Sequence, residues 1–176
     1  GFLYGASVSE PNFMGSGKAV SIGFQNSAGT QNYSIDYSDP FYTIDGVSRS
    51  ISLYYTRSSP GRVGLESYKT STFGASMTYG IPLSEFSSYS LGLGYGRIRI
   101  SDIDGSVVSP SVVQFVGNHP SPYNQFKLTS GIYYSTLDRA IFPTDGNQQG
   151  LSLIVGAPVM NDSLGYYKAT YTIKHY

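Results

Sequence analysis

The side chains best suited to chemistry in this chain are two histidines and a short acidic segment. His119 lies in a Gly-Asn-His-Pro segment and His175 lies next to the C-terminal residue. Neither histidine has a serine or acidic partner at a spacing typical of nucleophilic catalysis. The Asp102–Gly105 segment has the spacing of two calcium ligands, but it lacks the distal glutamate of a calcium loop and is explained by an ordinary Asp-Gly turn. We therefore expect no enzymatic activity, no cofactor and no metal site.

Two glycine-rich segments share only superficial features with nucleotide-binding loops. In Gly15–Lys18, Asn12 stands where a phosphate loop needs its first glycine, and Ala19 replaces the metal-binding hydroxyl residue. Gly92–Gly96 lies inside a strand-like pattern with no helix after it, so it is not a dinucleotide fingerprint. Both segments indicate turns and strand glycines.

The composition of the chain excludes several classes of protein. Of the 176 residues, 40% are apolar and only 12% are charged, which is about half the charged share of a soluble domain. The net charge of zero argues against a nucleic-acid partner, because phosphate binding needs an excess of lysine and arginine. No segment approaches the roughly 20 apolar residues of a membrane helix. The aromatic residues, 17 tyrosines and 9 phenylalanines, suit a boundary between apolar and wet surroundings.

Apolar residues recur at every second position along nearly the whole chain, which predicts nine β-strands and little helix. Turn-forming pairs such as Asp45-Gly46 and Asp145-Gly146 separate these runs, so neighbouring strands should pair antiparallel as a meander. The predicted strands are Phe2 to Val8, Val20 to Phe24, Tyr33 to Tyr37, Ile51 to Tyr55, Phe73 to Ile81, Tyr89 to Tyr95, Phe126 to Tyr134, Leu151 to Ala157 and Tyr167 to Ile173.

The positions between the apolar residues indicate what surrounds the strands. They carry mostly small or hydroxylated residues, such as Ser34, Gly94 and Thr129, where a soluble sheet would place charges. This pattern is typical of a wet lumen inside strands whose apolar face contacts lipid, with tyrosines as aromatic girdles. We predict an all-β fold, a transmembrane antiparallel meander barrel. A soluble barrel that binds an apolar ligand, with the two faces reversed, is the alternative.

The predicted connections are unequal in length. Pro82 to Ser88 is short, whereas Arg97 to Gln125 spans almost thirty residues. In membrane barrels the long loops face outside and the short turns face the periplasm. The long loop carries an apolar cluster of Val112, Val113, Phe115 and Val116, which we interpret as packing down on the barrel, or as a contact patch.

Four predicted turns are distinctive in sequence, order and spacing: Asn12–Gly17, Asp39–Ser48, Gly80–Glu85 and Leu137–Gly146. They resemble the turns of the BamA family of outer membrane assembly proteins within the Omp85 superfamily. The resemblance covers essentially all 176 residues and corresponds to about strands 2 to 10 of a sixteen-stranded family barrel. Both ends of the chain fall inside alternating patterns, so we expect residues 1–176 to be a partial barrel domain without POTRA domains.

This resemblance implies a function and a set of partners. The family folds and inserts β-barrel proteins in the outer membrane of Gram-negative bacteria. The implied partners are the lipid bilayer with its lipopolysaccharide, nascent outer membrane β-barrel proteins, and accessory assembly lipoproteins reached through POTRA domains. The Val-Arg-Gly motif of the family's lumenal loop is absent from this sequence. A passive, porin-like channel and a two-partner-secretion transporter of the same superfamily are therefore the alternatives.

Asp138 and Arg139 are the binding residues suggested by the sequence. They precede a Pro-Thr-Asp-Gly turn that the resemblance places on the periplasmic side. One hypothesis is a charge pair that braces the last POTRA domain. The other is a turn cap with an ordinary surface ion pair.

Overall fold

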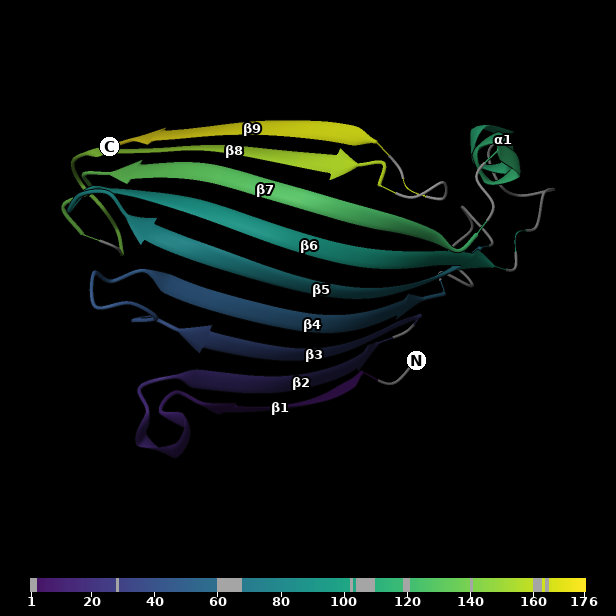
Figure 1. The fold of residues 1–176 in the computed structure, drawn as a ribbon, viewed down its shortest axis with the longest axis horizontal. Coiled ribbons are helices and arrows are strands. Elements are labelled where there is room, and N and C mark those ends of the chain that lie inside the picture. The colour runs from purple at the N-terminus through teal and green to yellow at the C-terminus, as the bar shows by residue number, and fades with distance from the viewer. Residues whose placement is uncertain are drawn as a thin grey trace.

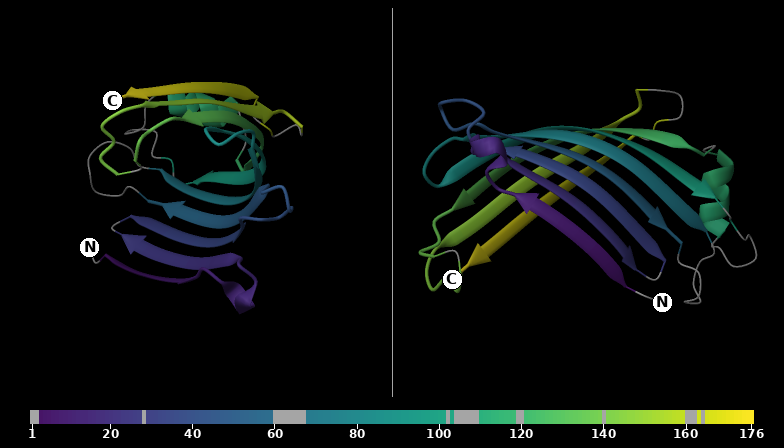
Figure 2. Two further views of the ribbon diagram at one scale, coloured as in Figure 1. Left: turned by 90° about the vertical axis from the view of Figure 1, so that its left-hand side faces the viewer. Right: turned by 90° about the horizontal axis from the view of Figure 1, so that it is seen from below.

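The computed structural model describes residues 3–27, 29–59, 68–101, 103, 110–118, 121–139, 141–159, 163 and 165–176. Within these residues one antiparallel sheet of nine strands runs in chain order from β1 to β9. The sheet curls into an arc that has β1 and β9 at its two edges (Figures 1 and 2). The predicted all-β meander is confirmed.

The strands are longest in the middle of the sheet and shorter toward β1. No helix in the described part of the chain is long and apolar enough to cross a membrane. The elements are β1 (Tyr4–Glu10), η1 (Phe13–Gly15), β2 (Ala19–Ser27), β3 (Thr30–Asp39), β4 (Ser48–Ser58), β5 (Lys69–Pro82), β6 (Ser87–Ser101), α1 (Pro110–Asn118), β7 (Tyr123–Ser135), β8 (Asn147–Ala157) and β9 (Tyr166–His175).

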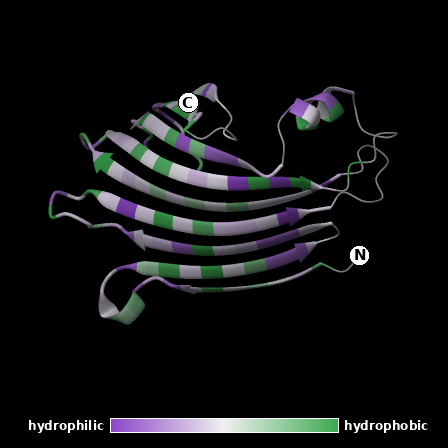
Figure 3. Ribbon diagram, turned by 45° about the vertical axis from the view of Figure 1, so that its right-hand side comes forward, coloured by the Kyte–Doolittle hydropathy of each residue, from purple (hydrophilic) through white to green (hydrophobic). Residues whose placement is uncertain are grey.

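The strand register brings the apolar residues of all nine strands onto one face. Ile22 lies opposite Ile35, and Ile35 lies opposite Leu53. Farther along the sheet, Met77 lies opposite Leu93. A slip of one residue would turn every apolar side chain to the other face, so the alternating sequence itself specifies this register. Hydrophobic and paler positions accordingly alternate along the ribbons in Figure 3.

The connections alternate between the two ends of the sheet. Residues 11–18, 40–47, 83–86 and 136–146 lie at one end, which we call the turn end. All four family-like turns are therefore on the same side. The other end, which we call the α1 end, carries the β2–β3 turn, the long connection with α1, and the N-terminus (Figure 1).

The predicted loop from Arg97 to Gln125 is wrong at both of its ends. Residues 97–101 continue β6 and residues 123–125 begin β7, so the connection is residues 102–122, and it contains the helix α1. In this part of β6 the alternation of apolar and polar residues inverts. After Leu93 and Tyr95, the next outward-facing positions on the strand are arginines. Val113 in α1 is 42% exposed, and the side chains of residues 112 and 115 lie outside the described residues.

Candidate membrane surface and turn sites

The outer, convex face of the sheet is a continuous apolar surface. Tyr33, Ile35, Leu91 and Leu93 keep 45%, 48%, 39% and 60% of their surface exposed. Among the described residues, Tyr123 is the only buried hydrophobic side chain. The apolar residues therefore do not form a dry centre. An exposed apolar surface of this extent needs a non-aqueous partner, and the hydrocarbon of a bilayer supplies it.

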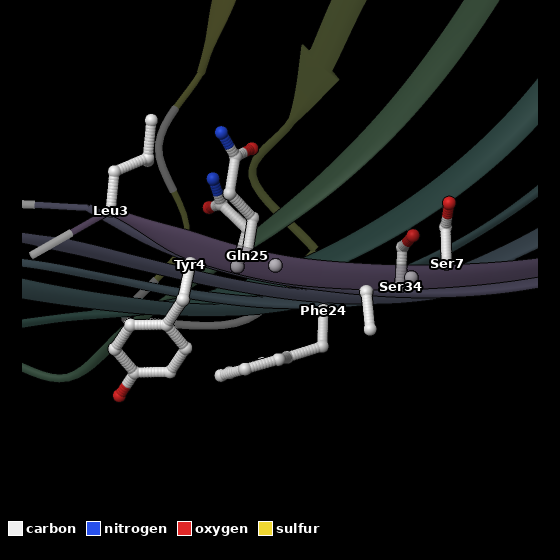
Figure 4. A pocket seen from close by; sticks show the side chains of 10 residues that line it. Leu3, Tyr4, Ser7, Phe24, Gln25 and Ser34 are labelled. Carbon is white, nitrogen blue, oxygen red and sulfur yellow. The ribbon is translucent and has the colours of Figure 1, made fainter.

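The inner, concave face is polar. Figure 4 shows Ser7, Gln25 and Ser34 on the side toward which the later strands curl, with the rings of Tyr4 and Phe24 on the opposite side. A soluble barrel that binds an apolar ligand needs the reverse arrangement, so the reversed-face alternative does not describe this sheet.

Polar side chains on the inner face pair with one another across the strands. The Ser52 hydroxyl donates a hydrogen bond of 2.6 Å to Asp36 Oδ1, between β4 and β3. Tyr133 lies opposite Gly150 and Tyr54 lies opposite Gly74, so aromatic rings and glycines face each other across neighbouring strands. This face suits contact with water.

An arginine lies among tyrosines where the outer face meets the turn end. The guanidinium carbon of Arg49 is 4.1 Å from the ring centroid of Tyr42 and 5.8 Å from that of Tyr37. The ring of Tyr42 also packs against Tyr79, with 5.7 Å between centroids. Since Tyr42 belongs to the connection 40–47, these contacts fix that connection to β3, β4 and β5.

An ion pair lies beside this aromatic group. Asp39 is 5% exposed, and its Oδ2 atom is 3.6 Å from the ammonium of Lys18. The Tyr37 hydroxyl donates a hydrogen bond of 3.5 Å to the same oxygen. Sequence reasoning predicted the tyrosine girdle but missed these charged residues. A usable signal in the sequence was that opposite charges, Asp39 and Arg49, flank a turn. The register of the structure places these two residues opposite each other.

The structure brings the two predicted site residues, Asp138 and Arg139, together at the turn end. Arg139 Nε donates a hydrogen bond of 3.0 Å to Asp138 Oδ2. The Thr144 amide and hydroxyl donate bonds of 3.0 and 2.8 Å to the same carboxylate, and the Asp145 amide donates one of 3.3 Å. These bonds, those of Thr144 first, lower the pKa of Asp138 to about 2. The carboxylate therefore caps its own turn.

The segment that shares features with a phosphate loop forms a structural turn. The side-chain oxygen of Asn12 accepts a hydrogen bond of 2.7 Å from the Gly17 amide, which closes the turn. Gly15 and Gly17 have φ of 72° and 71°, a region that glycine occupies without strain. Lys18 is committed to Asp39.

The remaining candidates for chemistry do not come together. His175 Nδ1 is 2.8 Å from Asn147 Oδ1 at the end of β9. His119, Asp102 and Asp104 lie outside the described residues. Within the described part of the chain, no group of three or more histidine or acidic side chains could hold a metal ion.

The chain is similar to known outer membrane proteins in sequence and in structure. The Omp85 superfamily domain matches residues 12–176. The outer membrane protein assembly factor BamA of Neisseria meningitidis serogroup B (strain ATCC BAA-335 / MC58) is 27% identical over 179 residues, which cover 97% of this chain and 22% of that protein. The crystal structure of BamA from Haemophilus ducreyi lacking POTRA domains 1-3 matches with a TM-score of 0.74 and 28% identity, over 89% of this chain and 31% of that chain.

These matches agree with the geometry of the sheet. This chain spans less than a third of either relative, at 22% and 31% of their lengths. The superfamily match covers the strands β2 to β9 and the four turns at the turn end. The chain belongs to the Omp85 superfamily, and its curved sheet is part of the wall of a β-barrel in the bacterial outer membrane.

Proposed function

We propose that this chain is part of the barrel wall of an outer membrane protein assembly factor, which folds and inserts nascent β-barrel proteins. Similarity to BamA along 97% of the chain supports this proposal. The activity belongs to the complete protein, because the chain corresponds to 22% of that relative. The proposed partners are the lipid bilayer, nascent β-barrel proteins, and accessory lipoproteins that contact other parts of the complete protein.

The observation that carries the proposal is the height of the apolar band on the outer face. On β3 the band lies between Gln31 and Asp39, and on β4 between Arg49 and Arg57, which are eight positions apart in each case. At about 3.3 Å per residue and a tilt of about 40°, this corresponds to a height of about 20 Å. On β6 the flanking positions, Ser87 and Arg97, are ten apart, or about 25 Å in height.

The lower band on β3 and β4 than on β6 favours a thinner bilayer beside β3 and β4. A mismatch costs only a fraction of a kcal/mol for each Å, so the lipid is locally deformed and the strands keep their structure. A thin, deformed bilayer lowers the barrier to inserting another barrel's strands. This fits an insertase better than a passive wall.

The test lengthens the band by one pair of residues. Asn26 and Gln31 face each other on the outer face, at the α1 ends of β2 and β3. Asn26→Leu with Gln31→Leu, made in the complete protein, should slow its insertion of a substrate barrel into liposomes severalfold. The matched control is Gln25→Leu with Asn32→Leu, the neighbouring pair on the inner face. Equal insertion rates for the two double variants would contradict the proposal.

The Asp138–Arg139 pair is proposed as a brace between this turn and a periplasmic part of the complete protein. The Arg139 side chain is 59% exposed, which leaves it accessible to a second contact. Arg139→Ala should lower assembly activity while the barrel folds normally. Unchanged activity in a normally folded barrel would contradict the brace. The pair would then serve only to cap its own turn.

The Ser, Thr and Gly positions of the inner face favour a second candidate, a passive channel. Single-channel conductance of the complete protein, measured beside its insertase activity in the same lipid, separates the two functions. A steady open conductance without insertase activity would support the channel.

A further inference from the structure

Four basic residues lie on the outer face at the α1 end of three neighbouring strands. Arg57 is in β4, Lys69 is in β5, and Arg97 and Arg99 are in β6. In the register, Arg57 lies opposite Ser71, and Ser71 lies opposite Arg99. The residues therefore share one face, and we call Arg57, Lys69, Arg97 and Arg99 the basic cluster.

The register also gives the size of the basic cluster. Strands lie about 4.8 Å apart, so the backbones of Arg57 and Arg99, with one strand between them, are about 10 Å apart. Arg97 and Arg99 are about 7 Å apart along β6. Long arginine side chains at these positions can converge on one group of oxygen atoms the size of a lipid headgroup.

Among the described residues, no neighbour neutralises the charge of the arginines in the basic cluster. Arg57, Arg97 and Arg99 are exposed, and their side chains make no hydrogen bond or ion pair in the described part of the chain. The acidic residues within the described ranges all lie elsewhere. They are Glu10, Asp39, Asp45, Glu85, Asp138 and Asp145 near the turn end, and Asp36 on the inner face.

Basic residues at the turn end differ in this respect. Lys18 is paired with Asp39, and Arg139 with Asp138. The guanidinium of Arg49 is covered by the ring of Tyr42. Within the described ranges, the arginines of the outer face that lack a side-chain partner therefore gather at the α1 end.

An apolar groove begins directly next to the basic cluster on the same face. Its volume is about 540 Å³, and its lining is almost entirely apolar. Ala75 on β5 and its direct partner Tyr95 on β6 line the groove, and Phe126 lines it from β7. On β5 the outward-facing residue next to Ala75 is Phe73, and on β6 the one next to Tyr95 is Arg97. The groove and the basic cluster are therefore adjacent along these strands. A molecule that spans both features must have an anionic head and an apolar chain.

We propose that the basic cluster and the groove bind one anionic lipid, with the phosphate headgroup on the arginines and an acyl chain in the groove. Guanidinium groups bind phosphate oxygens through charge-assisted, paired hydrogen bonds. The site depends on the location of the outer face in a bilayer and is independent of assembly activity. Its failure would therefore leave the proposed function intact.

The experiment uses the complete protein in detergent and counts bound lipids by native mass spectrometry. The probes are phosphatidylglycerol, which is anionic, zwitterionic phosphatidylcholine with the same acyl chains, and inorganic phosphate. Wild type should retain phosphatidylglycerol in preference to phosphatidylcholine, and salt should weaken this preference. The triple variant R57Q/R97Q/R99Q should bind phosphatidylglycerol at least about tenfold more weakly.

Two further variants keep the test decisive. R57K/R97K/R99K retains the charge and should retain most of the preference, even if the glutamine variant folds poorly. K168Q/K174Q removes two charges from the inner face, away from the groove, and should bind like wild type. An equal loss in this inner-face variant, a preference that salt leaves unchanged, or displacement of the lipid by inorganic phosphate alone would each overturn the proposal.

Discussion

The aromatic ring of Tyr54 lies over the backbone of Gly74, its direct partner between β4 and β5. A Cβ atom added at Gly74 would be 2.5 Å from Tyr54 Cε1 and from the phenolic oxygen. Gly74→Ala should therefore lower the free energy of unfolding by about 1–3 kcal/mol, because the ring must move from a packed position. Urea-induced unfolding of the barrel in detergent measures this change.

The control for this prediction is another glycine of the inner face. A Cβ atom at Gly94 meets its nearest neighbour, Lys127 Cβ, at 3.6 Å, which is an ordinary contact. Gly94→Ala should leave stability nearly unchanged. In a Tyr54→Ala background, Gly74→Ala should also cost little, and an undiminished cost there would mean that the ring is not the cause.

The assignment of the two faces predicts opposite effects for two neighbouring arginine substitutions. Leu93→Arg places a charge in the middle of the lipid-facing band and should destabilise the inserted barrel by about 2–4 kcal/mol. Ser76→Arg places a charge on the inner face, where water solvates it. Ser76 is on the neighbouring strand β5, next to Met77, the direct partner of Leu93. Folding yield in lipid vesicles, followed by heat-modifiable gel mobility, measures both. Equal tolerance of the two charges would contradict the assignment.

Arg49 is expected to hold the connection 40–47 against the sheet. Arg49→Ala removes the cation from the face of Tyr42, so amide hydrogen exchange in residues 41–46 should become faster. Arg57→Ala, at the other end of β4, is the matched control and should leave this exchange unchanged. Exchange that is equally slow in both variants would show that the connection is held by other contacts.

The turn at residues 136–146 should respond to acid in a defined range. The lowered pKa of Asp138 means that its carboxylate stabilises the folded turn fully above the ordinary value of 3.8, and that this contribution is lost as the pH falls toward about 2. The chemical shift of the Thr144 amide should therefore titrate with a midpoint near 2. Because the hydrogen bond from the Thr144 hydroxyl lowers the pKa of Asp138 more than the bond from Arg139 does, Thr144→Val should raise this midpoint more than Arg139→Gln does. The reverse order would contradict the assigned cause.

The alternating pattern predicted all nine strands and their pairing order, because one apolar face against lipid leaves one register available. The same reasoning failed at residues 97–101, where arginines take the outward positions and isoleucines the inward ones. Beyond the apolar band the outer face is no longer in contact with hydrocarbon, so the rule that apolar residues point outward ends there. The helix α1 was also missed, because its nine residues are too few to give a long amphipathic repeat.

The sites differed in how far the sequence could predict them. The Asp138 cap was one of the two hypotheses for that residue, because its donors, Thr144 and Asp145, follow a few positions later. The contact between Arg49 and Tyr42 joins a strand to a turn and depends on how the turn folds back. A local pattern cannot report such a contact. The basic cluster likewise needed the register of three strands, since Arg57 is far from Arg97 in the chain.

The meander has a consequence for the order in which the sheet forms. Within the described sheet, each strand pairs with its neighbours in the chain, so most pairings close a short hairpin soon after both strands are available. The junction between β6 and β7 is different, because residues 102–122 must first be spanned, and the entropy of closing a loop rises with its length. We therefore expect strands β1 to β6 and strands β7 to β9 to pair first as two separate units. The pairing of β6 with β7 is expected to form last.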